Sequence, residues 1–132
     1  MYDDPIGLIR VSLHVLAATI WVGGQLTLAG LVPVLRAAGG DLPAQAARAF
    51  NRIAWPAFWT LVVTGVWNYL AVHDNKPSAW EMIFGIKMLV VVASGATAWL
   101  HSHAKSRRSM AINGALTGLT ALTALVLGVA LG

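Results

Sequence analysis

The 132-residue chain contains no cysteine and few charged residues. Without thiols, the sequence excludes disulfides, zinc–thiolate sites, iron–sulfur clusters and c-type haem attachment. Charged residues make up 11% of the chain, whereas a soluble domain of ordinary composition contains about 25%. That is too little polar side chain to cover a core in water, so we expect a membrane protein.

Long apolar stretches take the place of the missing charge. The chain is 58% hydrophobic, with a mean hydropathy of +0.70. A helix crosses a bilayer with about 20 apolar residues, and stretches of this kind occur at Ile6–Val34, Ile53–Val72, Met82–Leu100 and Met110–Leu131. The first stretch is longer than the apolar part of a signal peptide and is expected to be retained. We therefore predict one domain, residues 1–132, folded as an all-α, integral membrane, antiparallel four-helix bundle.

The distribution of charge predicts an orientation. The net charge is +4, and four of the five acidic residues lie at the N-terminus or between the second and third stretches, the fifth being Asp41. Loops rich in lysine and arginine stay in the cytoplasm, which places both termini outside the plasma membrane. Because the basic residues flank apolar stretches, their role is to orient the chain in the lipid bilayer, its expected partner, and they do not indicate nucleic acid. The two basic connections carry Arg36, Arg48, Arg52, Lys105, Arg107 and Arg108.

Three ionisable residues lie inside the apolar stretches: Arg10, His14 and Lys87. A charge at membrane depth costs about 2.5–3.5 kcal/mol on insertion scales, so such a residue is expected to have a partner or a function. His14 and Lys87 enter from the same side to similar depth, and Asn68 reaches that level from the second stretch. We expect these four side chains to converge in the outer half of the bundle.

Polar residues also recur at helical spacing, so that each stretch has one polar face. The threonines and Asn68 of the second stretch are typical of contacts that hold membrane helices together. Trp21 lies deep in the first stretch, where packing or contact with a cofactor is needed to explain it. The faces of the first and third stretches consist of Arg10, His14, Trp21 and Gln25, and of Lys87, Ser94 and His101.

The segment His14–Gly24 resembles the first helix of copper-resistance D (CopD) domains and their small stand-alone relatives. Arg52–Asn68 and Gly85–Lys87 are similar to the second segment and the lysine-bearing helix of that family. More distantly, a histidine on the first helix and a lysine on the third resemble HemJ-type protoporphyrinogen oxidases, which are four-helix membrane proteins linked to haem b. Where HemJ-type proteins carry aromatic and basic residues, this chain has Gly23-Gly24-Gln25. The resemblance therefore leaves a haem-type pocket open, while HemJ-like oxidoreductase activity stays an alternative that this difference does not favour.

A haem b site used in redox or electron transfer is the leading hypothesis. Haem needs an axial ligand and an apolar slot, and its propionates need cations. His14 would supply the imidazole, Arg10 and Lys87 the counter-charges, and Trp21 and Asn68 the lining. The surfaces at Ala17-Ala18 and Gly23-Gly24 would form the slot. The second axial ligand is open between His73, Met82, Met88 and the His14 of a second copy.

Two other functions stay open. Cu(I) prefers thiolate and thioether ligands, so His14, His73 and Met88 would form at best a sparse copper site. Alternatively, the chain is an accessory membrane subunit without a cofactor, whose polar faces only pack helices. The pair Gly114 and Gly118 has the spacing of close helix–helix contacts. Together with the missing second axial ligand, this pair predicts a homodimer.

Overall fold

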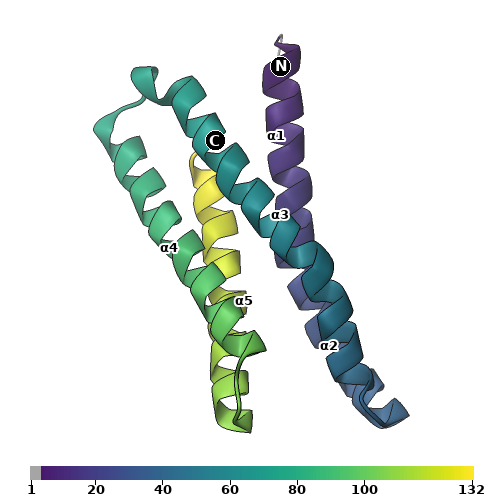
Figure 1. Ribbon diagram of the computed structural model, residues 1–132. Coiled ribbons are helices and arrows are strands. Elements are labelled where there is room, and N and C mark those ends of the chain that lie inside the picture. The colour runs from purple at the N-terminus through teal and green to yellow at the C-terminus, as the bar shows by residue number, and fades with distance from the viewer. Residues whose placement is uncertain (1–3) are drawn as a thin grey trace. The chain divides into compact units, whose positions relative to one another are not determined.

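The computed structural model describes residues 4–132, which form four long helices and contain no β-strand (Figure 1). The first helix has three consecutive parts, the middle one a π-helical turn, and a short 3-10 turn follows the second helix. The all-α prediction and the number of helices are confirmed. The elements are α1 (Pro5–Ala18), η1 (Thr19–Gly23), α2 (Gly24–Ala38), α3 (Leu42–Val72), η2 (His73–Asn75), α4 (Ser78–Ser102) and α5 (Arg107–Ala130).

The ends of the first helix follow from its terminal residues. The carboxylate of Asp4 accepts hydrogen bonds from the backbone amides of Ile6 and Gly7, at 3.0 and 2.9 Å. An aspartate at this position satisfies amides that have no acceptor within the helix. At the other end, Gly39 and Gly40 have φ values of +86° and +65°, which favour glycine and end the helix.

Three helices in the described part of the chain are long and apolar enough to cross a membrane: Pro5–Ala38, α4 and α5. Only 11% of the residues in the most apolar stretch of α4, and the same share in α5, are buried. Such extensive apolar exposure is what a lipid-facing surface requires. At 31 residues α3 is longer than α4 or α5, but residues such as Asn51, Thr60 and Asn68 make it less apolar. Its passage through a membrane stays a prediction.

The chain divides into two compact units, of which the first extends to Ala71. In this unit α3 runs antiparallel to the helix formed by α1, η1 and α2 (Figure 1). Contacts pair His14 with Thr64 and Trp21 with Phe58, so that residue numbers rise along one helix as they fall along the other. The buried apolar residues of this unit are Ala17, Trp21, Val22, Ala54, Ala57 and Phe58.

The second unit, Val72–Gly132, is the antiparallel hairpin of α4 and α5 (Figure 1). At one end, Trp80 Nε1 donates a hydrogen bond to the carbonyl oxygen of Leu131, at 3.0 Å. In the middle, the hydroxyl of Thr117 donates to that of Thr97, also at 3.0 Å. Small residues let membrane helices approach closely, and the buried residues here are all small: Ser94, Gly95, Thr117 and Ala121.

Candidate functional site

The histidine of the first helix forms a hydrogen bond to α3. His14 Nδ1 lies 2.8 Å from the hydroxyl oxygen of Thr64, a residue with only 3% of its surface exposed. The same hydroxyl donates to the backbone carbonyl of Thr60, at 2.6 Å. A threonine hydroxyl has one hydrogen, so an oxygen that donates to Thr60 accepts from His14. The proton of the neutral imidazole is therefore on Nδ1.

This arrangement selects one tautomer of the neutral imidazole. With the proton on Nδ1, the lone pair of the ring is on Nε2, which is the form that binds a metal ion. Histidine ligands of metals are commonly oriented by a hydrogen bond from the other ring nitrogen. A Cβ added at Gly65 would lie 3.4 Å from His14 Cε1, so the glycine beside Thr64 leaves room for the half-buried ring. His14 thus has the geometry of an oriented ligand.

Arg10 and Asn68 lie one helical turn beyond the His14–Thr64 pair, at matching levels of the antiparallel helices. Both side chains are half-buried. Arg10 Nε and Asn68 Oδ1 are buried atoms without a hydrogen-bond partner in the part of the chain that the structure describes. Leaving such atoms unsatisfied costs free energy, so this end of the helix pair is suited to a polar or charged group of a ligand.

Trp21 lies in the π-helical turn and is 4% exposed. Its ring centroid is 4.7 Å from that of Phe58 and 5.7 Å from that of Trp55. These contacts show that Trp21 packs α3 against the first helix. Trp59, which also lies deep in its apolar stretch, is 60% exposed and contacts Phe58 edge-on.

Lys87 belongs to α4 and thus to the second unit, whereas His14 belongs to the first. The half-buried lysine lies against α5, where a Cβ added at Gly128 would be 3.0 Å from Nζ. The structure therefore explains how the helix hairpin accommodates this side chain. That Lys87 converges with His14 stays a prediction.

The residues considered for copper belong to both units, with His14 in the first and His73 and Met88 in the second. In the described residues no three side chains of the His, Cys, Asp or Glu type are grouped so as to hold a metal ion. His73 lies in η2, where its Nε2 is 3.1 Å from a carboxylate oxygen of Asp74. Met88 is half-buried on α4. A site formed by these residues with His14 stays a prediction that no geometric grouping supports.

Glycines facing basic side chains are a feature that the sequence reasoning missed. Gly65 faces His14 and Gly128 faces Lys87, while a Cβ at Gly114 would lie 3.0 Å from the ring of His101. His101 Nδ1 is also 2.7 Å from the carbonyl oxygen of Met110. In each pair, a glycine on one helix admits a bulky basic side chain of the antiparallel helix. In the sequence, the available signal for each pair was a glycine at the level of a basic residue of the neighbouring antiparallel helix.

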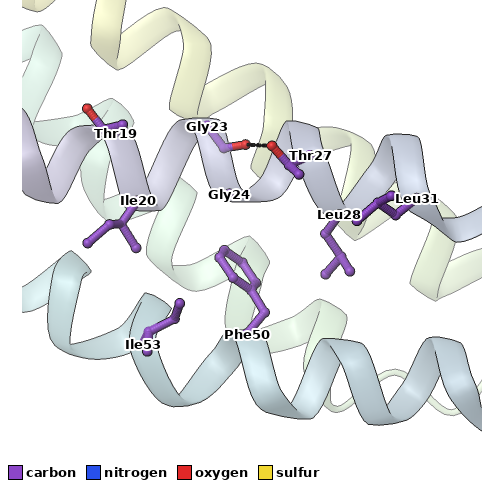
Figure 2. Close-up of a pocket in the computed structure, with 9 residues that line it drawn as sticks. All are labelled: Thr19, Ile20, Gly23, Gly24, Thr27, Leu28, Leu31, Phe50 and Ile53. Carbon is purple, nitrogen blue, oxygen red and sulfur yellow. Dashed lines mark hydrogen bonds between the residues drawn. The ribbon is translucent and has the colours of Figure 1, made fainter.

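An apolar groove of about 480 Å³ lies between α3 and the segment from η1 to α2, as Figure 2 shows. The ring of Phe50 lies against Gly24, where an added Cβ would collide with it. Phe50 of α3 thus lies directly beside Gly24, because a glycine without a side chain leaves space there for an aromatic ring, while a Cβ added at Gly23 would meet nothing within 4 Å. That this surface holds a cofactor stays a prediction. The residues lining the groove are Thr19, Ile20, Gly23, Gly24, Thr27, Leu28, Leu31, Phe50 and Ile53.

A second groove of about 350 Å³ adjoins the hydrogen-bonded pair of His14 and Thr64. Thr64, which holds His14, is part of its wall, together with Leu13 from α1. Two exposed tryptophans, Trp59 and Trp67, lie two turns apart along this side of α3 and also line the groove. The groove thus offers mainly aromatic and aliphatic surface, and it meets His14 only through Thr64.

Comparisons of the chain with protein-family models, with curated proteins and with solved structures find no match.

Proposed function

We propose that this chain is an integral membrane, CopD-like protein that binds haem b through His14 and takes part in electron transfer. The observation that carries the proposal is the chain of hydrogen bonds from His14 Nδ1 through the Thr64 hydroxyl to the Thr60 carbonyl. It directs the lone pair of the imidazole to Nε2, as an axial ligand requires.

Membrane insertion is supported by three helices of sufficient length and hydropathy. With α3 as a fourth passage, the basic connections would lie in the cytoplasm and both termini outside the plasma membrane. This orientation would put His14 in the outer half of the bilayer.

The surrounding residues fit the needs of haem in part. Arg10, with its buried unpartnered Nε, would pair with a propionate, and Asn68 would line the pocket beside it. The second groove, beside Thr64, would accept an edge of the macrocycle. Haem b held in this way would carry one electron by alternating between ferric and ferrous iron. Lys87 would be a second counter-charge.

The sixth ligand of the iron is assigned only as a set of candidates. A homodimer would supply the His14 of a second copy, and this, together with the Gly114–Gly118 pair, is the reason for proposing two copies. Within one chain the candidates are His73, Met82 and Met88.

Substitution of His14 tests the proposal. Protein purified from cells that supply haem should show a Soret absorbance, and His14→Ala should lose at least about nine-tenths of it per mole of protein, because the axial ligand is gone. His103→Ala is the matched control, since this histidine lies on the connection at the end of α4. Unchanged haem content in His14→Ala would exclude His14 as the ligand.

A cofactor-free accessory subunit is the second candidate, favoured by the glycine–histidine and glycine–lysine pairs, which are also a way to pack helices. Colourless, metal-free protein with intact helices would support it. Copper in place of haem by elemental analysis would support the copper site, for which the described residues offer no thiolate and no cluster of ligands.

A further inference from the structure

The connection between α4 and α5 is a concentrated patch of positive charge. Lys105, Arg107 and Arg108 fall within four consecutive positions, with His103 just before them. All four side chains are exposed. The ion pairs between residues 4 and 132 are Arg48–Asp41 and His73–Asp74, so no acidic side chain neutralises this patch.

The two arginines also occupy an unfavourable place on the helix. Arg107 and Arg108 begin α5, whose first turn contains no acidic residue. The start of a helix carries partial positive charge and is stabilised by anions, not cations. Ser106 caps the helix by accepting from the amide of Ser109, at 3.1 Å, which satisfies one of the first amides and leaves the positive end of the dipole exposed. Both the helix and the side chains therefore favour an anion from outside the chain.

The acids of the same hairpin are too far away to supply that anion. Asp74 and Glu81 lie at the opposite end of α4, a helix of 25 residues and thus about 37 Å in length at 1.5 Å per residue. The Debye length in physiological salt is about 8 Å. The positive patch is consequently not compensated within the hairpin.

The patch lies at a level where phospholipid headgroups are expected. It connects two helices that are both long and apolar enough to cross a membrane. Trp99, which is 53% exposed, stacks on His103 with ring centroids 4.3 Å apart, and tryptophan is enriched at the boundary between lipid and water. Anions of the cytoplasmic leaflet are mainly lipid phosphates, and arginine binds phosphate through two parallel hydrogen bonds.

We infer that the α4–α5 connection, formed by His103, Lys105, Arg107 and Arg108, is a binding site for the phosphate headgroup of an anionic phospholipid. The site requires that α4 and α5 span the membrane, but it does not depend on haem at His14. Such a site differs from the general role of basic loops in orienting a membrane protein. A lipid bound at a site stays with the protein after extraction from the bilayer.

The experiment compares lipids retained by the purified full-length protein, measured by native mass spectrometry after exchange into phosphatidylglycerol or phosphatidylcholine. The test variant Lys105→Gln/Arg107→Gln/Arg108→Gln is matched by Arg36→Gln/Arg48→Gln/Arg52→Gln, which removes the same charge from the other basic connection. We expect phosphatidylglycerol to bind the wild type in preference, and the test variant to bind it at least about tenfold more weakly. The control should bind within about twofold of the wild type.

Arg108→Lys separates charge from geometry, since it keeps the cation and loses the planar fork; an intermediate affinity is expected. Helical content from circular dichroism verifies that each variant folds. Equal losses in the two triple variants, or equal retention of the two lipids by the wild type, would overturn the site. Displacement of phosphatidylglycerol by millimolar inorganic phosphate would also overturn it, because the site would then be one for free phosphate.

Discussion

Through its hydrogen bond to His14, Thr64 sets the orientation and the tautomer of the imidazole. Thr64 lies on a polar face that was interpreted as a set of helix-packing contacts, and its bond to His14 of the first helix is a contact of that kind. Other threonines of this face bond only to a carbonyl of their own helix. Thr60 is such a residue, because its hydroxyl donates to the carbonyl of Pro56, at 2.9 Å. Identical side chains one turn apart thus have different roles, depending on whether a histidine of another helix faces them.

Thr64→Val should weaken haem binding by about 10–100-fold, the usual effect of removing the group that orients a metal-binding histidine. Valine keeps the shape of the side chain and removes the acceptor, so His14 loses the bond that fixes the proton on Nδ1. The dissociation rate of haem and the position of the Soret band measure the effect. Thr60→Val is the control, since its hydroxyl does not contact His14. Equal haem affinity in the two variants would contradict the role assigned to Thr64.

The first helix contains two adjacent glycines that have different surroundings. Gly23 and Gly24 are adjacent in sequence, yet a Cβ at Gly23 would meet nothing within 4 Å, whereas a Cβ at Gly24 would collide with the ring of Phe50. The pair was expected to form a cofactor slot. That expectation used only the absence of side chains, and it had no information on which residue of α3 lies opposite.

Gly24→Ala should destabilise the protein by about 1–3 kcal/mol, the usual cost of adding volume to a packed contact. Thermal unfolding in mild detergent measures the change. Gly23→Ala should leave the midpoint unchanged or slightly raised, because alanine favours a helix. Combining Gly24→Ala with Phe50→Ala should cost less than the sum of the two single changes, since the collision is gone. Strict additivity would show that Phe50 is not the obstacle.

At the scale of the whole molecule, Gly114 and Gly118 of α5 could allow close packing either within one chain or between two chains. Gly114 already faces the ring of His101, while a Cβ at Gly118 would meet nothing within 4 Å. Gly114→Ala should therefore lower the thermal stability by about 1 kcal/mol without changing the molecular mass in detergent. A homodimer built on this pair would instead be weakened by both Gly114→Ala and Gly118→Ala. Light scattering on the two variants distinguishes the outcomes.

The orientation of the whole molecule is open to direct labelling, because the chain has no cysteine of its own. Cysteine introduced at Ala104, in the α4–α5 connection, should not react with an impermeant maleimide added to intact cells. Cysteine introduced at Asn75, between α3 and α4, should react. The reverse pattern would invert the proposed orientation, and reaction at both positions would mean that α4 does not cross the membrane.

Hydropathy and helical spacing are properties of neighbouring residues, so the sequence already contains the number of helices, their approximate ends and the polar face with His14. α3 begins at Leu42, well before the apolar stretch at Ile53, and hydropathy alone does not mark these first turns because they are polar or rich in alanine. Contacts between helices depend on which residues face one another, and this requires the fold. Three such contacts are those of Thr64 with His14, Phe50 with Gly24 and His101 with Gly114. The register between two helices is set by the packing of both surfaces and not by the residues of one helix.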